Sequence, residues 1–227
     1  ERRITLDAEG RVTGVALREH LDAHQVVEDF MIAANVAAAK ALEEQKSPLI
    51  YRIHETPSRE KLVALKDYLK TFDIEFALGQ VIKPATFNAI LEKVTDDEIR
   101  PQIMESVLRS QTQAIYTPQN AGHFGLSLGS YAHFTSPIRR YADLIVYRAL
   151  VGAFDLEMPA PKDKDIKPTT GLSSRDFERL DVTAETISRY ERRAMEAERE
   201  TVDRYVAAYL SAHVGEIVDA RITGVQN

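Results

Sequence analysis

The sequence predicts an α+β fold that is mostly helical, and three features lead to this class. Apolar residues recur at helical spacing in several segments between residues 21 and 152. Alternating stretches typical of strands are short and few, as in "RITL" and "RVTGVAL" near the start. A segment of mixed charge that begins at Ser173 has the pattern of one long helix.

The composition excludes several classes of protein. The chain has 227 residues and a hydrophobic share of 44%, enough for one large domain or one domain with an appended piece. Without cysteine, neither a disulfide framework nor a thiolate-ligated zinc site can form, which fits a reducing cytosol. We find no signal peptide and no long apolar segment, so the sequence supports neither export nor a membrane location. We therefore expect a cytoplasmic protein.

The net charge limits where nucleic acid could bind. With 29 basic and 35 acidic residues, the formal charge of the chain is −6. A protein that binds nucleic acid over its whole surface is usually basic. Any nucleic-acid site on this chain must therefore be local, such as a lined groove or pocket.

Both ends of the sequence indicate a piece of a longer protein. The first residues read as a β-hairpin around Ala8-Glu9-Gly10, with no earlier sheet for the hairpin to join. The last residues, "VGEIVDARITGVQN", begin a new strand pattern that stops almost at once. We expect further sequence on both sides.

The first half of the chain predicts four helices and one strand. Residues 21–46 form a long amphipathic helix that ends at Ser47-Pro48, and residues 49–55 form a short buried strand. A Thr56-Pro57 cap starts the next helix, and two more helices cover residues 83–94 and 96–114. The side chains expected in the core are Val26, Val27, Phe30, Met31, Ala34 and Ala38 from the first helix, and Leu62, Leu65 and Leu69 from the second.

The second half begins with an extended, glycine-rich passage over residues 115–135. A helix over residues 137–152 follows it. Residues 154–172, which carry several prolines and lysines, read as a surface loop. From Ser173 to about Ala212 the pattern fits a single helix of roughly 35 residues.

Three arginines gather in "AHFTSPIRRYADLIVYRAL", residues 132–150. Ser136 suits the N-cap of the predicted helix, and Pro137 suits its first position. Arg139 and Arg140 then lie in the first turn, where cations oppose the helix dipole. A helix start with free amides is a natural phosphate site, so a bound phosphate would compensate these arginines. The expected core side chains are Ile138, Tyr141, Ala142, Ile145 and Ala149.

The motif "GLSLG" at residues 125–129 matches the nucleophile elbow of hydrolases, with Ser127 as the nucleophile. That chemistry needs a strand, a tight turn and a helix that present the serine beside a histidine. The chain lacks the strand–helix alternation of a hydrolase, so a glycine-bent strand is the favoured interpretation.

The acidic cluster "TDDEI" at residues 95–99 could suggest a metal site. We favour a capping box instead, with Thr95 at the helix start and Glu98 reaching back. Asp163 and Asp165 lie among lysines and are expected to be solvated. No other acidic spacing resembles a two-metal site, which needs several carboxylates converging on closely spaced ions. The sequence therefore shows no metal site.

The rings of the glycine-rich passage leave two interpretations open. Phe124, Tyr131 and Phe134, together with His123 and His133, stand close in sequence to the arginine helix. Aromatic faces beside a phosphate site are typical of proteins that hold single-stranded nucleic acid. Rings that alternate along a strand are equally common in a core.

The continuous string "HFGLSLGSYAHFTSPIRRYADL" resembles the signature of the RNB family, the catalytic domain of exoribonucleases such as ribonuclease II and ribonuclease R. The histidine, the paired glycines, the Thr-Ser-Pro cap, the paired basic residues and Asp143 fall at the spacing of the family. The segments "AHQVVEDFMIAANVAAAKAL", "YRIHETPSREKL" and "ERRAMEAERETVDRY" also resemble family segments. Tyr147 departs from the histidine that usually precedes Arg148.

The resemblance implies a domain organisation. Residues 1–212 would be the mostly helical C-terminal part of an RNB catalytic domain. Residues 213–227 would start an OB-fold, a β-barrel domain that binds RNA. The family's clustered aspartates, which hold magnesium, would precede Glu1, so this chain would supply RNA and phosphate contacts and be inactive alone.

The resemblance also implies an activity and the residues that serve it. The family members are processive, magnesium-dependent 3′-to-5′ exoribonucleases that degrade single-stranded RNA to nucleoside 5′-monophosphates, and we expect the whole protein to be a monomer. Arg139 falls on the catalytic arginine that holds the scissile phosphate. The further residues expected to contact RNA are Glu28 or Asp29 at the ribose hydroxyls, Glu198 near the RNA 3′ end, and His133, Phe134, Thr135, Ser136, Arg140, Tyr141 and Arg148.

The two carboxylates on the first long helix carry a more specific expectation. Glu28 and Asp29 follow a Val-Val pair and precede Phe30-Met31, so one of them should lie near the buried face. A buried carboxylate needs a donor, and a ribose hydroxyl could be that donor.

Two alternatives to the enzyme remain at this point. A non-catalytic RNA-binding protein could use the same fold after losing its metal carboxylates. A helical interaction scaffold would have no RNA role at all. The residues before Glu1 would separate the first alternative from an enzyme, and RNA binding would exclude the second.

Overall fold

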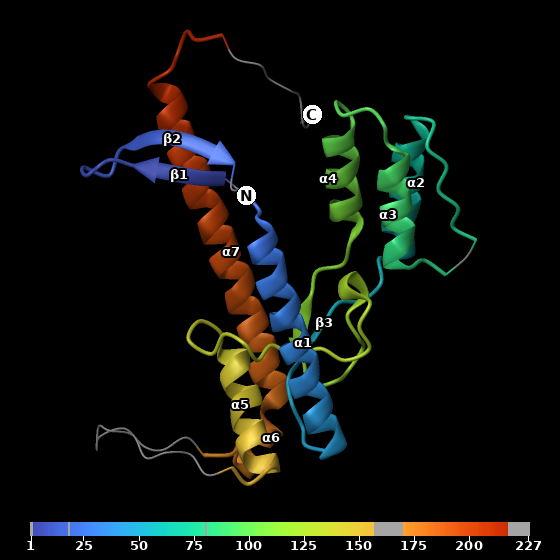
Figure 1. Cartoon of the computed structure of the whole chain (residues 1–227), viewed down its shortest axis with the longest axis vertical. Helices are drawn as coiled ribbons and strands as arrows, with labels where there is room; N and C mark the ends of the chain where they lie inside the picture. The colour runs from blue at the N-terminus through green and yellow to red at the C-terminus, as the bar shows by residue number, and fades with distance from the viewer. Residues whose placement is uncertain (1, 18, 80, 157–169, 218–227) are drawn as a thin grey trace. The chain divides into compact units, whose positions relative to one another are not determined.

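The order of the elements follows the sequence prediction, from an N-terminal hairpin through several helices to one long C-terminal helix (Figure 1). The computed structural model describes residues 2–17, 19–79, 81–156 and 170–217. The chain divides into two compact units, residues 1–30 with 188–227 and residues 31–187. The described part is mostly helical with few strands, which confirms the α+β class.

The first unit contains the predicted hairpin. Strands β1 (Arg2–Leu6) and β2 (Val12–Leu17) pair in antiparallel register. Asp7 shapes the turn between them, because its Oδ1 accepts two backbone N–H groups of the turn at 3.1 and 2.7 Å. Gly10 has a φ of 79°, a left-handed conformation that glycine adopts at no steric cost.

Helix α1 (Asp22–Glu44) is the predicted first helix, and its two halves differ in burial. The buried side chains of the second half are Asn35, Ala38, Ala39 and Leu42. In the first half Phe30 is 73% exposed and Val26 and Val27 are more than half exposed, so the core positions predicted for these three were wrong. Helical spacing identifies side chains that share a face, but whether another element covers that face depends on the tertiary structure.

The core of the second unit forms around a short sheet. Strand β3 (Tyr51–Ile53) pairs antiparallel with β4 (Ile115–Thr117), which confirms the predicted strand within residues 49–55. One cluster joins α1 and β3 to α5 (Tyr141–Ala153) through Ala39, Leu42, Ile53, Val146 and Ala149. A second cluster joins Ile50, Ala142 and Ile145 to Leu180 and Ala184.

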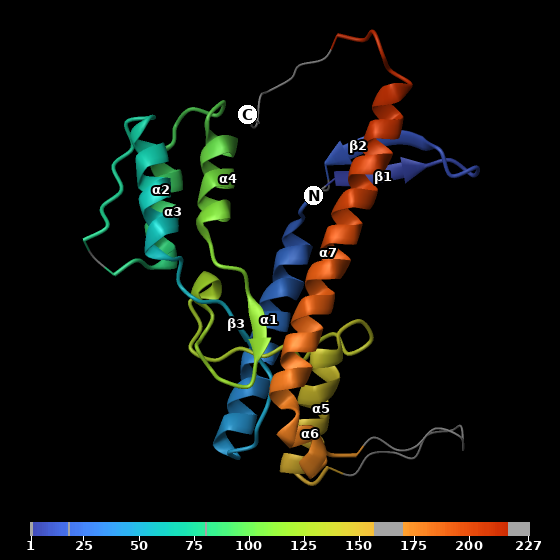
Figure 2. The same cartoon turned by 180° about the vertical axis from the view of Figure 1, so that it is seen from behind.

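Three helices form a separate layer within the second unit (Figures 1 and 2). They are α2 (Arg59–Lys70), α3 (Pro84–Lys93) and α4 (Arg100–Ser110), and α4 contacts both of the others. Their apolar core contains Leu65, Leu69, Phe87, Ile90, Ile103 and Val107, with Leu62 partly buried against it. The core positions predicted for Leu62, Leu65 and Leu69 of α2 are thus confirmed.

The start of α2 differs from the prediction by one polar residue. Ser58 caps the helix, and its Oγ accepts the N–H of Lys61 at 3.4 Å. The predicted Thr56-Pro57 cap was therefore wrong. Serine and threonine are both good N-caps, so where two of them precede a helix, sequence alone does not choose between them.

The capping box predicted at Thr95 and Glu98 is also wrong. Asp96 instead accepts the N–H of Glu98 on its Oδ1 at 2.8 Å, and a turn precedes the helix. Helix α4 then begins at Arg100 rather than at residue 96. A short aspartate side chain that bonds the backbone two residues later offers an alternative to the helix.

Helix α5 begins at Tyr141, not at Pro137 as predicted. Residues 137–139 form a turn, in which the N–H groups of Arg139 and Arg140 both donate to the carbonyl of Ser136 at 3.2 Å. Arg140 is extended, with φ −130° and ψ 124°, so Ser136 does not cap this helix.

The late start of α5 changes which side chains of the predicted stripe are buried. Ala142, Ile145 and Ala149 lie in the core as predicted. Ile138 is 97% exposed and Tyr141 is 54% exposed, so these two assignments were wrong. Because the turn at residues 137–139 breaks the helical period, side chains before Tyr141 no longer share a face with those after it.

The predicted C-terminal helix is two helices. They are α6 (Ser174–Glu178) and α7 (Leu180–Ser211), separated at Arg179, where φ is −110° and ψ is 9°. Most of the predicted loop, residues 157–169 with Asp163 and Asp165, lies outside the described residues, as does most of the expected OB-fold start, residues 218–227. Among the described helices, none combines the length and the apolar character that crossing a membrane requires.

Candidate functional site

The candidate site lies on the segment between Tyr131 and α5, within the second unit. Asn35 of α1 holds this segment: its Oδ1 accepts the N–H groups of Phe134 (2.8 Å) and Thr135 (3.2 Å). Its Nδ2 donates to the hydroxyl of Tyr131 at 3.0 Å. A buried side chain from a distant helix thus fixes the backbone that leads to the arginines.

Arg140 and Asp143 form a two-pronged ion pair. The Arg140 Nε and Nη2 atoms donate to the two carboxylate oxygens, each at 2.8 Å. The Asp143 side chain is fully buried, and its Oδ1 also accepts the N–H of Ser136 at 2.7 Å. A buried carboxylate needs this many donors to be stable. Arg140 therefore serves the local structure, whatever else it contacts.

Arg139 has different surroundings. Its side chain is exposed, and its Nε donates to the Oγ of Ser136 at 2.7 Å. Among the residues that the structure describes, no carboxylate forms an ion pair with this guanidinium. An arginine held at Nε presents its remaining N–H groups to an anion, and this geometry suits a phosphate.

His133 belongs to this segment and lies near the charged groups of Arg52, Arg140 and Asp143. Its Nδ1 is 2.8 Å from the hydroxyl of Tyr116, and the ring of Tyr116 lies under the guanidinium of Arg52 at 4.6 Å. Burial, followed by the positive charges of Arg140 and Arg52, lowers the pKa of His133 from 6.5 to about 3. The imidazole is therefore neutral at physiological pH and acts as a hydrogen-bonding group.

The aromatic residues of this passage differ in burial. Tyr131 is buried, so it belongs to the core, whereas Phe124 is half-buried and packs edge to face on Phe87 with centroids 6.1 Å apart. Phe134 is half-buried and stacks on Tyr147 at 4.6 Å with an interplanar angle of 21°. Tyr147, which departs from the family's usual histidine, thus supports the segment through its ring.

Arg148, in the C-terminal half of α5, is anchored through its guanidinium. Its Nη2 donates to Asp176 (2.9 Å) and to the carbonyl of Gly171 (3.1 Å), and its Nε donates to the carbonyl of Thr170 (3.2 Å). These contacts connect α5 to α6. The RNA contact expected of Arg148 stays a prediction.

Glu28, Asp29 and Glu198 belong to the first unit. Glu28 and Asp29 are both exposed, so the expectation that one of them is buried was wrong. Glu28 lies 3.8 Å from the Nε2 of His20, and Asp29 accepts a hydrogen bond from Gln25 at 3.2 Å. The sequence indicated that the apolar face of α1 near these carboxylates would be buried, but Val26, Val27 and Phe30 on that face are exposed.

Ser127 does not have the context of a nucleophile elbow. Its φ of 56° is left-handed, but it follows a single 3₁₀ turn (Phe124–Leu126) instead of a strand. Its side chain is exposed, and residues 130–140, all described, contain no helix. The nucleophile elbow is therefore excluded, but the favoured glycine-bent strand was also wrong, because Gly125 lies in the 3₁₀ turn and His123 and Leu128 form only isolated bridges.

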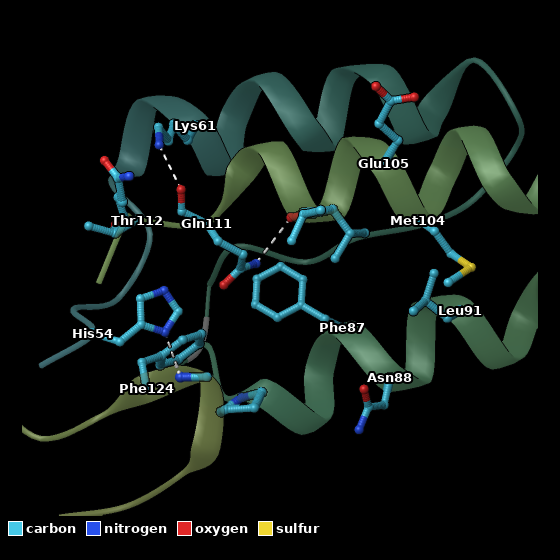
Figure 3. Close-up of a pocket in the computed structure, with 15 residues that line it drawn as sticks. His54, Lys61, Phe87, Asn88, Leu91, Met104, Glu105, Gln111, Thr112 and Phe124 are labelled. Carbon is cyan, nitrogen blue, oxygen red and sulfur yellow. Dashed lines mark hydrogen bonds between the residues drawn. The ribbon is translucent and has the colours of Figure 1, made fainter. Parts of the chain in front are cut away.

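A pocket of about 810 Å³ lies beside this turn, between α3, α4 and His54, the residue that follows β3 (Figure 3). The His54 ring is fixed because its Nδ1 accepts the N–H of Gly125 at 2.8 Å. Apolar side chains dominate the lining: Phe87, Leu91, Met104, Val107, Leu108 and Phe124. Sequence reasoning did not find this pocket, because its lining comes from segments that are far apart in the chain.

Magnesium is the metal that the resemblance implies, and the described residues do not fit it. No group of three or more His, Asp or Glu side chains in the described part could hold a metal ion. Magnesium prefers several oxygen ligands in near-octahedral geometry. Asp143, the buried carboxylate of the site, is occupied by Arg140 and by a backbone N–H.

Asn35 is the main site residue that sequence reasoning missed. A signal was present, because Asn35 is a polar residue on a helix face otherwise lined by alanine and leucine. Buried polar side chains need partners, so such a residue predicts a specific contact. The partner segment, about 100 residues away in sequence, is a matter of tertiary structure.

The chain is similar in sequence and in structure to ribonuclease R proteins. Ribonuclease R of Vibrio parahaemolyticus is 35% identical over 225 residues, which make up 99% of this chain and 27% of that protein. Two structures of Mycoplasma genitalium RNase R, one in complex with ribose methylated single-stranded RNA and one with double-stranded RNA, match with a TM-score of 0.81 and 26% identity. The match covers 95% of this chain and 33% or 37% of those chains.

The curated relatives are much longer than this chain, which spans between 27% and 31% of their length. A model of the RNB domain matches residues 1–155, a range that contains Asn35, Arg139 and Asp143. Since this match covers well over half of the sequence, the chain belongs to the RNB domain family.

Proposed function

We propose that this chain is part of a 3′-to-5′ exoribonuclease that degrades single-stranded RNA processively to nucleoside 5′-monophosphates. The observation that carries the proposal is Arg139, an exposed arginine anchored by Ser136 within a chain that matches the RNB domain. The ribonuclease R relatives and the RNA-bound Mycoplasma structures support it. The whole protein would act as a cytoplasmic monomer.

Arg139 would hold the scissile phosphate. A guanidinium that is already fixed at Nε loses little freedom when it binds, and its charge stabilises the charge that develops on the phosphate oxygens. Ser136 precedes the turn at residues 137–139 and Tyr141 follows it, and both side chains are at least partly exposed, so they would contact the adjacent nucleotides. His133, Phe134, Thr135 and Arg140 would support these contacts from within.

The carboxylates of the first unit would read the sugar and the RNA end. Glu28 or Asp29 would accept hydrogen bonds from ribose hydroxyls, and their exposure in this chain leaves both accessible to a ligand. Glu198 would lie near the RNA 3′ end. The corresponding test is RNA-over-DNA preference in the single variants Glu28→Ala and Asp29→Ala.

Magnesium would supply charge neutralisation and an activated water in such an enzyme. The residues of this chain that the structure describes do not fit it, so the metal ligands would come from the rest of the protein. This chain would contribute the residues that bind the phosphate and the sugar.

The test uses the whole protein with magnesium and single-stranded RNA labelled at either end. We expect RNA labelled at the 3′ end to release labelled mononucleotide at once, whereas RNA labelled at the 5′ end goes to a short end product without accumulating intermediates. A DNA strand of the same sequence should remain intact. Internal cleavage products would contradict the proposed polarity, and tight binding without cleavage would favour the non-catalytic RNA-binding alternative.

A further inference from the structure

Asn35 is an amide buried among apolar side chains, with only 2% of its surface exposed. Burying an amide costs free energy unless its donors and acceptors are paired. Its Nδ2 and Oδ1 both bond to the segment of Tyr131, Phe134 and Thr135, at 2.8 to 3.2 Å. Asn35 therefore joins α1 to the backbone that precedes Arg139.

The orientation of this amide is determined by its partners. The N–H groups of Phe134 and Thr135 are donors, so they require the oxygen of the carboxamide. The Tyr131 hydroxyl accepts from the nitrogen at 3.0 Å. A flipped amide would direct its NH₂ group at two N–H donors, so these donors disfavour the flip. The Tyr131 hydroxyl adds to this preference because it accepts from the nitrogen in the observed orientation.

Asp143 holds the next residue of the same segment. Its Oδ1 accepts the N–H of Ser136 at 2.7 Å, so three successive backbone N–H groups donate to side-chain oxygens from two helices. The hydroxyl of Thr135 is buried and has no hydrogen-bond partner among the described residues. The path of this segment thus depends on its main-chain bonds to Asn35 and Asp143.

These contacts lead from Asn35 and Asp143 to Arg139. Ser136, fixed through its N–H group, accepts a hydrogen bond from the Nε of Arg139 on its Oγ at 2.7 Å. A shift of residues 134–135 would therefore move Ser136 and redirect the guanidinium. Asn35 itself is too buried to contact RNA.

We propose that Asn35 is a positioning residue, which holds the backbone of residues 134–135 so that Ser136 directs Arg139 at the RNA phosphate. This inference rests on the proposed function. A misplacement of about 1 Å at a reacting centre can lower a rate on the order of 100-fold. Loss of Asn35 should thus affect turnover well beyond its effect on folding.

The test uses three substitutions in the whole protein, measured by single-turnover cleavage and by affinity for RNA. Asn35→Leu, which removes the amide at similar volume, should lower the cleavage rate about 10-fold to 100-fold, with little change in affinity. Asn35→Asp keeps an oxygen acceptor for both N–H groups and should restore most of that loss. Tyr131→Phe removes only the hydroxyl that orients the amide and should lower the rate less than Asn35→Leu.

A matched control comes from α4. Ser110 is buried like Asn35 and donates to the carbonyl of Val107 at 2.6 Å, away from the site. Ser110→Ala should lower the melting temperature without lowering the cleavage rate at a temperature where the protein is folded. If Ser110→Ala and Asn35→Leu lower the rate equally, Asn35 is a structural residue and the proposal is wrong.

A double-mutant cycle tests whether Asn35 acts through Arg139. In the Arg139→Ala background, Asn35→Leu should change the rate by about twofold or less, because the group that it positions is gone. Hydrogen exchange at Phe134, Thr135 and Ser136 should be faster in Asn35→Leu than in the parent. If Asn35→Leu fails to fold, the same two measurements on Tyr131→Phe decide the question.

The outcomes separate this proposal from the proposed function. If the parent cleaves RNA and the effects of Asn35→Leu and Arg139→Ala multiply, or Asn35→Leu has no effect, only the positioning role is wrong. If the parent cleaves no RNA, the proposed function is wrong and the positioning role falls with it. Non-multiplicative effects with rescue by Asn35→Asp would support the role.

Discussion

The two neighbouring arginines at the start of α5 differ in what holds them. Arg140 forms a bidentate pair with the buried Asp143, whereas exposed Arg139 is held at Nε by Ser136. Identical side chains one residue apart thus have different expected roles. Substitutions at the two positions should separate stability from catalysis.

Arg139→Ala is expected to lower turnover of the whole protein by about 100-fold or more, the scale for loss of one charge-stabilising donor. Its melting temperature should hardly change, because the arginine is exposed. Arg139→Lys keeps the charge without the planar fork and should fall between the alanine variant and the parent. An Arg139→Ala variant with a clearly lower melting temperature but normal specific activity when folded would identify Arg139 as structural.

Arg140→Ala is expected to destabilise the second unit by about 3–5 kcal/mol, since it leaves the carboxylate of Asp143 buried without its charge partner. Urea unfolding measures the loss. The double variant Arg140→Met with Asp143→Leu removes both charges and should recover much of the stability. Equal stability of Arg140→Ala and the parent would show that the pair contributes nothing.

His133 is expected to make the stability depend on pH. Its pKa is about 3 in the folded state, against 6.5 for an ordinary histidine. Below about pH 6.5 the unfolded state binds the proton and the folded state does not, so the free energy of unfolding falls as the pH falls. Between about pH 7 and pH 5 the loss should be about 1–2 kcal/mol.

The control for this effect is His133→Asn, which can still pair with the hydroxyl of Tyr116 but does not titrate. Urea unfolding of this variant should show a shallower decrease over the same pH range. His123, whose pKa is lowered to about 4 by burial and then by His54, contributes in the same direction in both proteins. An unchanged slope in His133→Asn would refute the assignment.

At the scale of elements, the interiors of helices were easier to predict than their starts. Leu65, Leu69, Ala142 and Ile145 were predicted from spacing and are buried. The helix starts at Arg59, Arg100 and Tyr141 were not predicted. Two polar residues precede α2 and either could cap it, whereas no side chain caps α4 or α5, which begin after turns.

The capping box of α6 is one start that the structure makes testable. Ser173 Oγ accepts the N–H of Asp176, and Asp176 accepts the N–H of Ser173 in return and pairs with Arg148. Ser173→Ala should lower the free energy of unfolding by about 1 kcal/mol. Ser174→Ala, one residue into the helix, is the matched control and should have little effect.

At the scale of the whole molecule, the residues with proposed roles in RNA binding belong to two compact units. Arg139 and the residues that position it belong to residues 31–187, whereas Glu28, Asp29 and Glu198 belong to the other unit. The chain spans between 27% and 31% of the length of its curated relatives.

This chain alone is expected to release no mononucleotides from RNA. Phosphoryl transfer with two metal ions needs converging carboxylates, and no such group exists among residues 2–17, 19–79, 81–156 and 170–217. The measurement incubates the purified chain with magnesium and 3′-labelled single-stranded RNA beside the whole protein. Mononucleotide release by the chain would mean that it holds a metal site of its own.

Local spacing and continuous motifs were sufficient to predict the fold class, the hairpin, the buried faces of α2 and α5, and the family. The sequence also indicated Arg139, because the motif around it is continuous. The sequence did not determine that Phe30 is exposed, that Arg140 bonds the buried Asp143, or that Asn35 holds the segment. These three features depend on contacts between residues that are distant in sequence, or on which of several polar groups bonds a given partner. Both are set by the tertiary structure.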